Sequence, residues 1–575
     1  MLTTAAELAF QAIALVAETF PTITTAAATL AATLTVQKAY RAYQHWNTKE
    51  IKRRLTDTLV KALQKAPIVG PKVREWVDME VNGVLSGVKK EVDEARAGIE
   101  PIPVLPEDGL SEEVIRQRLA GLQTHYKPGT LSGAVYAEYD EKLSALLQYV
   151  WSKTALTNPL HSEWPLINLM EAEVISMCQQ LLHGEQGAPG MMTHGGSTSI
   201  LEACKAYVLY ARANGNNDPE IIVPESVHVA FDKAAKLLNA RLIKVPVDPK
   251  LGTADVRAME RAITSRTCLI VGSAPSFPSG VMDPIQDLAA VAKKHCLPCH
   301  VDSCLGGFLT VFAKEAGFSI PPCDFSVDGV TSVSIDTHKY GQTPKGTSVL
   351  LFKRGCSATP THAHLDWVGG MYVTPGIDGS RSGADIATAW AVLCYKGRKE
   401  YVKETAAILS LQRDLVEQLR KIEGVCIPYD PKLSVIPIQT AKGINSLLVA
   451  DRLKSAGWSV SILQTPDQRP DGFHFCLTAV HAHQSDFAKR FIQALSEAVQ
   501  YAKTHPKEVP GGMAKAYGKL ANGVPRCVQE QLARGYMQLL STLHNRVSGS
   551  LWSSSPPAAT VIADNQPAVT LRHTK

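Results

Sequence analysis

The residues best suited to chemistry lie in the stretch Ser334-Ile-Asp-Thr-His-Lys339-Tyr-Gly341. An apolar run, 329–335, leads into this stretch, and a turn at 343–346 and a second apolar run, 348–352, follow it. A lysine between two buried strands costs free energy unless its charge is used or removed. Such a lysine is expected to have a lowered pKa and to form a Schiff base with an aldehyde. On these residues alone, the alternative is a strand-end lysine that extends to water.

Three further segments carry side chains that suit an aldehyde cofactor with a phosphate group. Gly195-Gly196-Ser197 stands at a predicted helix start, where free N–H groups and the helix dipole bind phosphate. Asp302 ends an apolar strand, and an aspartate there keeps a pyridinium nitrogen protonated. His228 follows another strand, and its flat imidazole can stack on a pyridine ring. Each alone has an ordinary alternative (a capped helix, an N-cap, a turn histidine), but with Lys339 the set predicts a pyridoxal 5'-phosphate site.

The elements that must position these residues alternate along the chain from about Pro128. Short apolar runs are separated by helical stretches, and this alternation predicts crossover units and a mainly parallel sheet. The apolar runs are 221–223, 241–245, 268–272, 299–302 and 332–335. Ligands of such sheets bind at the carboxyl ends of the strands, which is where most of the candidate residues fall.

The composition is that of a globular protein with more than one domain: 575 residues, 45% apolar and 20% charged. The net charge of +5 is small for this length and argues against a dedicated nucleic-acid binder. The twelve cysteines are scattered, as expected of free thiols in a reducing compartment. His362 and His364, and likewise His481 and His483, are two residues apart without further ligands nearby in the sequence. We interpret both pairs as surface-loop histidines and expect no metal site.

The N-terminal segment, 1–46, is a candidate membrane anchor. Thr19–Gln37 carries no charge, and basic residues follow from Lys38 onward, which favours a span whose following part faces the cytosol. The run is rich in Ala and Thr, and Glu18 and Pro21 interrupt the apolar stretch. The alternative is a soluble helix packed on the body or on a partner subunit.

The segments on either side of the alternating region have different patterns of apolar and polar residues. Residues 47–125 form a predicted helical segment, broken by prolines 101, 103 and 106, with a new helix beginning at 111–113. A smaller α+β domain is predicted at 396–510, with a long helix at 401–422, strands at 435–438 and 473–477, and a helix near 485–501. Residues 511–575 are an extension whose tail, rich in Ser, Pro and Ala, is predicted to be disordered.

With the phosphate-binding glycines, histidine, aspartate and lysine in this order, the chain resembles the pyridoxal-phosphate enzymes of aspartate-aminotransferase-like fold. Within them it is similar to the group II decarboxylases, and most similar to the sphingosine-1-phosphate lyase family. The motifs that carry the resemblance are Ser132-Gly-Ala-Val-Tyr136, Thr157-Asn-Pro-Leu-His161, His194-Gly-Gly-Ser-Thr-Ser-Ile200, His300-Val-Asp302-Ser-Cys-Leu-Gly-Gly-Phe308, Asp336-Thr-His-Lys339-Tyr-Gly, Pro344-Lys345-Gly346, Gly379-Ser-Arg381 and Gly512-Met-Ala-Lys-Ala-Tyr-Gly518. The resemblance extends from about residue 100 to about residue 525.

The resemblance implies an α/β fold of type I. The large, cofactor-binding domain would span 126–395, with a mainly parallel seven-stranded sheet, and the smaller C-terminal α+β domain would follow it. It also implies a homodimer with shared active sites, in which Gly379 and Ser380 reach the cofactor phosphate of the partner subunit. The expected location is the endoplasmic reticulum membrane with the catalytic domain in the cytosol, or the cytoplasm if residues 1–46 do not span.

The resemblance further implies the reaction and the roles of single residues. Lys339 would carry the cofactor, with His338 beside it, while the C2–C3 bond of a phosphorylated long-chain base breaks in a retro-aldol step. The products would be phosphoethanolamine and a long-chain aldehyde. Tyr136, His161 and Lys345 would bind the substrate phosphate, although a loop lysine without a ligand is the alternative for Lys345.

Three positions depart from the family pattern. Thr198 replaces a glutamate, Gln342 replaces an aromatic residue, and Ser382 replaces a proline. None removes a reacting group, but each can tune substrate fit or rate. The rival functions are a group II amino-acid decarboxylase, which breaks the bond to a carboxylate, and a scaffold of the same fold that binds no cofactor.

Overall fold

The computed structural model describes residues 60, 62–64, 70–96, 102–120, 127–358, 360–463, 472–511 and 526–541. The candidate membrane anchor at 1–46 and the tail predicted to be disordered lie outside these residues. Within the described ranges, no helix has both the length and the apolar character needed to cross a membrane.

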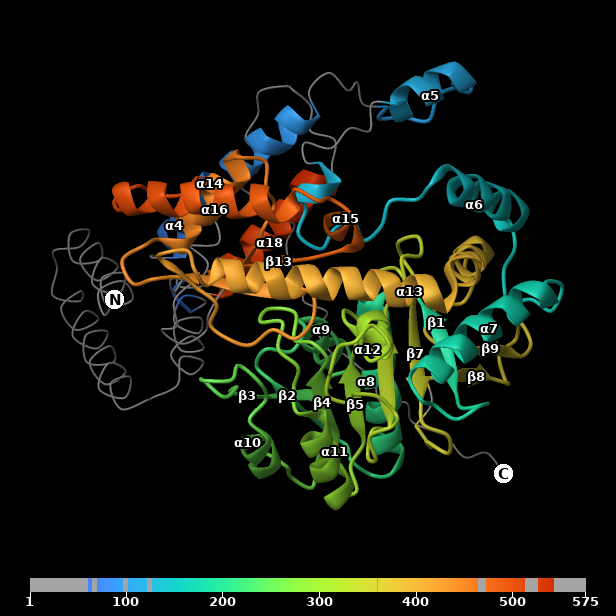
Figure 1. The fold of residues 1–575 in the computed structure, drawn as a ribbon. Helices are drawn as coiled ribbons and strands as arrows, with labels where there is room; N and C mark the ends of the chain where they lie inside the picture. The colour runs from blue at the N-terminus through green and yellow to red at the C-terminus, as the bar shows by residue number, and fades with distance from the viewer. Residues whose placement is uncertain are drawn as a thin grey trace, which may run out of the picture.

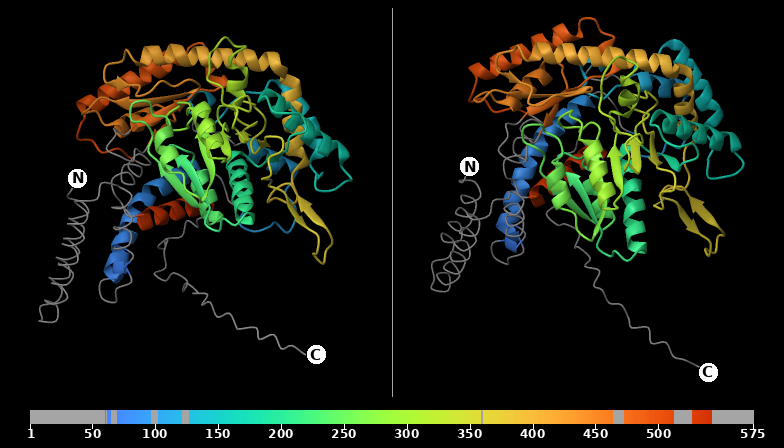
Figure 2. Two further views of the ribbon diagram at one scale, coloured as in Figure 1. Left: turned by 90° about the horizontal axis from the view of Figure 1, so that it is seen from below. Right: turned by 60° about the horizontal axis from the view of Figure 1, so that its bottom comes forward.

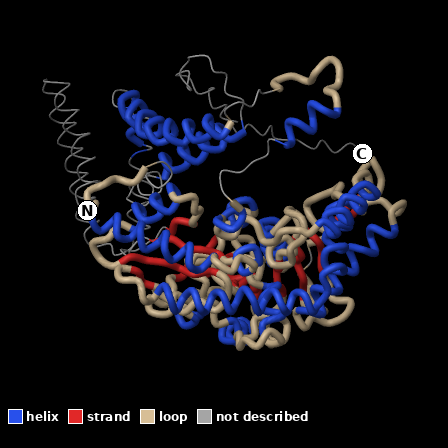
Figure 3. Tube along the Cα trace, turned by 45° about the horizontal axis from the view of Figure 1, so that its top comes forward, coloured by secondary structure: helices blue, strands red, loops and turns tan. Residues whose placement is uncertain are grey.

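A seven-stranded sheet forms the centre of the molecule, with helices on both of its faces (Figures 1 and 3). The strand order is β1-β7-β6-β5-β4-β2-β3, and β7 runs antiparallel to its neighbours β1 and β6. The strands are β1 (Gly190–Thr193), β2 (Glu220–Pro224), β3 (Arg241–Val245), β4 (Thr267–Ser273), β5 (Cys299–Asp302), β6 (Ser332–Ile335) and β7 (Ser348–Phe352). The predicted mainly parallel, seven-stranded sheet is therefore confirmed.

The central strands are buried along their whole length, because helices cover both faces. Every residue of β2, β4, β5, β6 and β7 is buried, whereas the edge strand β3 is partly exposed. Continuous apolar runs are what such doubly covered strands require, which explains why the sequence pattern located them. The covering helices are α7 (Pro165–Leu181), α8 (Gly196–Ala213), α9 (Ala230–Leu237), α10 (Val256–Arg261), α11 (Ile285–Lys294) and α12 (Gly307–Ala313).

The long helix α13 (Gly383–Leu419) runs between the large sheet and the C-terminal elements (Figure 1). The predicted helix at 401–422 is confirmed within a few residues as the part of α13 after Gly397, and the part from Gly383 to the kink was not predicted. Ser382 caps this earlier start, since its side chain accepts a hydrogen bond from the backbone N–H of Asp385. Gly397, with φ 63° and ψ 171°, kinks the helix, and this break hid its first part from the sequence pattern. The predicted domain boundary at 395–396, which stays a prediction, lies next to the kink.

A four-stranded sheet of order β10-β11-β13-β12 forms the smaller C-terminal unit. Its strands are β10 (Val425–Cys426), β11 (Val435–Thr440), β12 (Ser461–Leu463) and β13 (Gly472–Cys476), and its helices are α14 (Ser446–Ser455), α15 (Ala479–Ala482) and α16 (Phe487–Thr504). Phe473 and Phe475 of β13 are fully buried and pack in the core with the helix residues Phe487 and Phe491. The predicted strands near 435–438 and 473–477 and the helix near 485–501 are confirmed within a few residues.

Two short strands, β8 (His362–His364) and β9 (Tyr372–Thr374), form a hairpin that projects from the body (Figure 2). The interpretation of His362 and His364 as loop residues is therefore wrong, because both lie on β8. It is also wrong for His481, which is fully buried in α15. His481 Nδ1 accepts a hydrogen bond from the backbone N–H of Thr478 at 2.8 Å, so this histidine completes a helix cap.

The remaining helices lie outside the two sheets. They are α4 (Gly70–Ala95), α5 (Glu112–Ala120), α6 (Glu141–Thr154), α18 (Arg526–Ser541) and the 3-10 helix η1 (Pro128–Thr130). The N-terminal α4 packs on the C-terminal α18 through a small core that includes Val77, Val81 and Val528. The predicted helix that begins near 111–113 is confirmed as α5, and α6 is held at its start by Asp140, whose side chain accepts from the Leu143 N–H at 2.7 Å.

Candidate active site at the carboxyl ends of the central strands

The candidate residues meet where β5 and β6 end and α8 begins. Asp302 is the last residue of β5 and pairs in register with Ser334 of the neighbouring parallel strand β6. Lys339 follows β6 by four residues, in the turn that leads to β7. Carboxyl ends of adjacent parallel strands share one edge of the sheet, so the topology brings Asp302 and Lys339 to the same place.

Lys339 is held by an ion pair within its own turn. Its Nζ lies 2.9 Å from Oδ2 of Asp336, whose side chain is 1% exposed. Burial alone would lower the pKa of Lys339, but the nearby Asp336 carboxylate, together with Cys304 and Asp302, raises this pKa above its usual value. The predicted lowered pKa is therefore wrong for the protein as it stands, because the sequence pattern took account of burial but not of Asp336.

Asp302 is 7% exposed and accepts a hydrogen bond from the backbone N–H of Cys304 at 3.1 Å. A buried carboxylate at a strand end is the group that a pyridinium nitrogen needs as a partner. The described residues thus fit pyridoxal 5'-phosphate at this end of the site, with Lys339 for its aldehyde and Asp302 for its ring nitrogen.

The predicted phosphate-binding turn forms the start of α8. Gly195 has φ 91°, in the region that favours glycine, and Gly196 is the first residue of the helix. A Cβ added to Gly196 would lie 2.7 Å from Oδ1 of Asp336 and 2.8 Å from Sγ of Cys304. The backbone of the helix start therefore approaches the lysine turn as closely as glycine permits, which fits a group bound through N–H donors.

Hydroxyl side chains of this turn point in two directions. Ser197 is exposed, as a phosphate ligand requires. Ser199 is fully buried, and its Oγ lies 2.6 Å from Oγ1 of Thr193 and 2.8 Å from Oγ of Ser348, which ties the turn to β7. Thr198, which departs from the family pattern, donates its hydroxyl to the carbonyl of His194 at 3.4 Å, a local backbone contact.

The two candidate histidines follow different strands: His228 comes after β2 and His338 comes after β6. His338 donates from Nδ1 to the carbonyl of Thr347 at 2.5 Å, and burial lowers its pKa. His228 lies after β2, half-buried, and its Nδ1 accepts a hydrogen bond from the Ala230 N–H at 3.2 Å. Its ring lies 6.4 Å from the ring of Phe277. Stacking of His228 on a cofactor ring stays a prediction.

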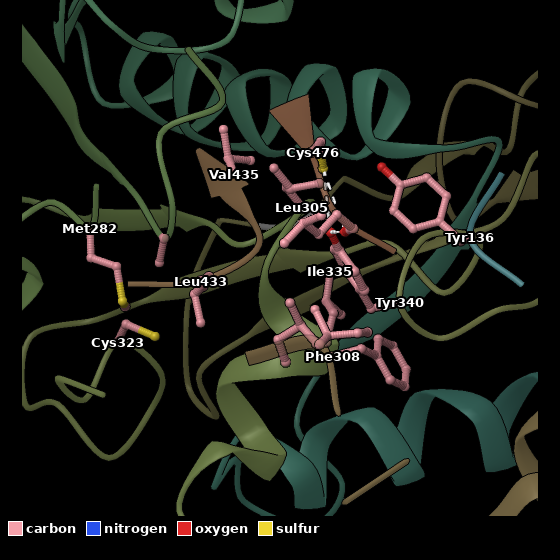
Figure 4. Close-up of a cluster of buried hydrophobic side chains, with 14 of the residues drawn as sticks. Tyr136, Met282, Leu305, Phe308, Cys323, Ile335, Tyr340, Leu433, Val435 and Cys476 are labelled. Carbon is pink, nitrogen blue, oxygen red and sulfur yellow. Dashed lines mark hydrogen bonds between the residues drawn. The ribbon is translucent and has the colours of Figure 1, made fainter. Parts of the chain in front are cut away.

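Lys345 and Tyr136, predicted to bind the substrate phosphate, are brought together by the fold. The Lys345 Nζ lies 4.5 Å from the centre of the Tyr136 ring. Burial, followed by the charge of Lys339, lowers the pKa of Lys345. The Tyr136 ring meets the Tyr340 ring edge-on at 5.0 Å, and Figure 4 shows both beside Cys476 in the buried cluster. Burial raises the pKa of Tyr136, so its phenol keeps its proton as a donor.

His161, the third predicted phosphate ligand, has contacts with other residues than this pair. It is exposed in the segment between α6 and α7, and its ring lies 6.0 Å from the Trp164 ring. Among the described residues, no hydrogen bond or ring contact joins it to Tyr136 or Lys345. Its backbone N–H donates to the Asn158 carbonyl at 3.2 Å, and the Asn158 side chain donates from Nδ2 to the Ser380 hydroxyl at 3.0 Å. His161 therefore belongs to the same loop system as Ser380.

The loop that carries Gly379 and Ser380 is fastened to α8. The Ile377 N–H donates to Oε1 of Glu202 in α8 at 2.7 Å. Asp378 Oδ2 lies 3.0 Å from Nδ1 of His194, just before the glycine turn. The loop is thus linked by two hydrogen bonds to α8 and to the residue before the phosphate-binding turn.

A buried ion pair fixes the end of this loop. The Arg381 guanidinium donates from both terminal nitrogens to the Glu171 carboxylate of α7, at 2.9 Å for the Nη2–Oε2 contact. The two side chains are 9% and 12% exposed, so the bidentate pair holds the start of α13 against α7 in a sheltered place.

Two residues of this region were assigned no structural role from the sequence. Asp336 was part of a quoted motif without a role, although its position three residues before Lys339 in a turn was a usable signal. Gln342, with φ 59° and 3% exposure, donates from its side-chain Nε2 to the Glu404 carboxylate of α13, and its backbone carbonyl accepts from the Tyr139 hydroxyl at 2.7 Å. This departure from the family pattern therefore links the lysine turn to α13.

Known proteins share both the sequence and the fold. Residues 136–439 match the model of the pyridoxal-dependent decarboxylase conserved domain. A probable sphingosine-1-phosphate lyase of Legionella pneumophila is 39% identical over 89% of this chain and 88% of its own length. Sphingosine-1-phosphate lyase 1 of Rattus norvegicus is 35% identical over 88% of each chain.

Solved structures give the same answer for the fold. A sphingosine-1-phosphate lyase of Burkholderia pseudomallei superposes with a TM-score of 0.67 at 33% identity, covering 74% of this chain and 97% of the other. Glutamate decarboxylase of Lactobacillus brevis superposes with a TM-score of 0.62 at 20% identity, over 72% of this chain and 98% of its own, and at that identity it shows the fold alone.

Gly196→Ala tests the close approach of α8 to the lysine turn. The added methyl group meets the Asp336 carboxylate, and such overpacking costs about 1–3 kcal/mol. We expect the affinity for pyridoxal 5'-phosphate, measured by titrating the absorbance of the bound cofactor, to fall by about tenfold or more. Gly83→Ala in α4, where the methyl group meets open space, is the matched control and should bind normally. Unchanged affinity in a folded Gly196→Ala variant would contradict the assignment.

Proposed function

This chain belongs to the pyridoxal-dependent decarboxylase family and, within it, to the sphingosine-1-phosphate lyases, and from this premise we propose how its residues divide the reaction. It is a pyridoxal 5'-phosphate-dependent carbon–carbon lyase. It cleaves the C2–C3 bond of phosphorylated long-chain bases to phosphoethanolamine and a long-chain aldehyde, in sphingolipid degradation.

The large-domain residues hold the cofactor. We assign Lys339 to its aldehyde, Asp302 to its ring nitrogen, His228 to the face of its ring, and the turn at 195–197 to its phosphate. When bound, the cofactor supplies an electron sink for the pair released from the breaking bond. Asp302 keeps that sink effective by holding a proton on the ring nitrogen, and His338 stands beside Lys339 as a neutral side chain.

The substrate phosphate is assigned to Tyr136, Lys345 and His161. Lys345 lies against Tyr136 without a carboxylate of its own at ion-pair distance among the described residues, so its charge is available to an anion. The exposed imidazole of His161 completes the set from the segment between α6 and α7. This division between two lysines is the single observation that carries the assignment: Lys339 has an acidic partner at 2.9 Å, and Lys345 lies over a phenol.

A second copy of the chain is proposed to cover the face formed by α6, α7 and the β8–β9 hairpin. These elements lie on one side of the molecule in every view (Figures 1 and 2). Large apolar side chains are exposed across them: Tyr149, Trp151, Leu156, Leu166, Leu169, Leu365, Trp367, Val368 and Met371. An exposed apolar surface of this breadth is typical of a subunit interface. The same side carries Gly379 and Ser380, which we propose reach the cofactor phosphate of the partner subunit.

Membrane attachment through residues 1–46 is a separate proposal, with the catalytic part on the cytosolic side of the endoplasmic reticulum. The uncharged Thr19–Gln37 run and the basic residues after it support this proposal. Flotation of the full chain with liposomes, compared with a chain lacking residues 1–46, tests it. Equal flotation of both chains would contradict it.

Product analysis decides between the lyase and the runner-up, an amino-acid decarboxylase. The cofactor-loaded protein is incubated separately with a phosphorylated long-chain base, glutamate and an aromatic amino acid. The lyase releases equal amounts of aldehyde and phosphoethanolamine from the first substrate alone. Carbon dioxide without aldehyde would overturn the assignment. A protein that shows no absorbance from a bound cofactor would instead favour the scaffold.

Lys345→Ala should keep the cofactor and lose turnover. A hydrogen bond to a charged group contributes about 1.5–3 kcal/mol, so we expect kcat/KM to fall by about tenfold to about 150-fold. The cofactor absorbance, measured on the same sample, should be unchanged because Lys339 is intact. Lys250→Ala, which removes an exposed loop lysine, is the control. Loss of the cofactor from the Lys345→Ala variant would show that the assignment is wrong.

Mixed dimers test the proposed contribution of Ser380 to the partner's site. Lys339→Ala removes the cofactor lysine, and Ser380→Glu places a negative charge beside the cofactor phosphate, so each variant alone should be inactive. After unfolding and joint refolding in equal amounts, half of the dimers are mixed and carry one intact site. Activity should then return to about one quarter of that of the unaltered protein. No recovery would place Ser380 in the site of its own subunit.

A further inference from the structure

The reaction assigned above gives no role to the buried carboxylate of Asp336, which lies beside the cofactor lysine. It directly follows β6 and is 2% exposed. Burying a carboxylate is costly unless it is paired or hydrogen-bonded, so its position needs a reason.

The two oxygens of Asp336 have different surroundings. Oδ2 lies 2.9 Å from Nζ of Lys339 and 3.6 Å from Nε2 of His338. Oδ1 is buried and has no hydrogen-bond partner among the described residues. Gly196 leaves no room for a side chain beside either oxygen. One oxygen thus holds the lysine, and the other is free to carry a proton.

The charges around Lys339 nearly cancel. Asp336 and Asp302 contribute two carboxylates, and Lys339 and Lys345 contribute two ammonium groups. The titratable groups that face the ion pair from the surrounding elements are Asp302, Cys304, His338, Lys345, Cys476 and Tyr136. In this balance Asp336 is the group closest to the Lys339 amine, so its removal leaves an ammonium without its nearest counter-charge.

Other groups are less suited to take a proton from Lys339. His338 engages Nδ1 with the Thr347 carbonyl, and its Nε2 lies against Asp336. Burial raises the pKa of the Cys304 thiol, so it is not a ready base. Asp302 is committed to the ring nitrogen in the reaction assigned above.

We propose that Asp336 is the positioning residue of the cofactor lysine: it holds the Lys339 amine at the strand end and takes its proton when the amine attacks an aldehyde. This inference rests on the proposed role of Lys339 as the cofactor lysine and assigns a function to its neighbour.

The proton balance of the step closes without any further reactant. Lys339 enters as an ammonium and passes one proton to Asp336, so that its lone pair forms a C–N bond with the aldehyde carbon. Asp336 then returns this proton to the aldehyde oxygen, which becomes a hydroxyl. The nitrogen, which has formed the C–N bond and is positively charged, gives Asp336 a second proton, and Asp336 passes this proton to the hydroxyl so that it leaves as water when the C=N bond forms. Lysine, aldehyde and carboxylate thus give a protonated C=N bond, water and the same carboxylate.

The unaltered protein provides the first test. The full chain, freed of cofactor, is treated with an amine-acylating reagent over pH 7–11, and labelling of each lysine is followed by peptide mass spectrometry. Asp336 stabilises the ammonium form of Lys339. The labelling midpoint of Lys339 should therefore lie at a higher pH than that of Lys345. A lower midpoint for Lys339 would overturn the proposal, and this comparison requires no variant to fold.

Variants of Asp336 provide the second test. In Asp336→Asn the midpoint for Lys339 should fall by one pH unit or more, which is about a tenfold gain in labelling at a fixed pH below the midpoint. Asp336→Glu keeps the charge and should restore a high midpoint. Asp232→Asn removes the partner of the exposed Lys244 and is the matched control, with Lys339 unchanged. Equal midpoints in Asp336→Asn and the unaltered protein would overturn the proposal.

The two proposals fail in different ways. Labelling is measured without substrate or cofactor, so its outcome does not depend on which reaction the protein catalyses. Failure of the lyase assignment would change the products and leave the labelling intact. Failure of the Asp336 role would leave the products intact and remove the shift in labelling.

Discussion

The site depends on a balance between burial and charge at the end of β6. Lys339 is placed among buried strands, where desolvation favours a neutral amine, and Asp336 at 2.9 Å reverses that preference. The ion pair is sheltered, since the lysine side chain is 24% exposed and the aspartate 1%. A lysine held in this way is fixed in position and protected from stray electrophiles, but it must release a proton before it can react. The close start of α8 at Gly196 maintains this arrangement from the other side.

Around this pair, the fold separates two tasks. We propose that Lys339 and Asp302, at the sheet edge, serve the cofactor, and that Lys345, in the turn that follows, serves the substrate phosphate. Lys345 lies over Tyr136 instead of a carboxylate. The loop with Ser380 is tied to α8 and α7 by separate contacts, so the parts that would meet a partner subunit are fixed to the same elements as the phosphate-binding turn.

Much of this could be predicted from the sequence, and the rest depended on contacts between distant segments. The buried strands are recognisable in the sequence as apolar runs. The positions of Asp302 and Lys339 near the ends of strands could therefore be predicted. The first part of α13 was missed because Gly397 interrupts the helical pattern. The predicted direction of the Lys339 pKa shift was wrong, because that shift depends on the turn that places Asp336 beside the amine. Among the described residues His161 makes no hydrogen bond or ring contact with Tyr136 or Lys345, and such contacts depend on tertiary placement, which no local pattern encodes.

The most direct test of this account is to identify the lysine that carries the cofactor. Treating the loaded protein with borohydride reduces the C=N bond and leaves the pyridoxyl group attached to its lysine, which peptide mass spectrometry then locates. The account predicts the modification on Lys339, with Lys345 unmodified. A pyridoxyl group on Lys345, or on neither lysine, would contradict it.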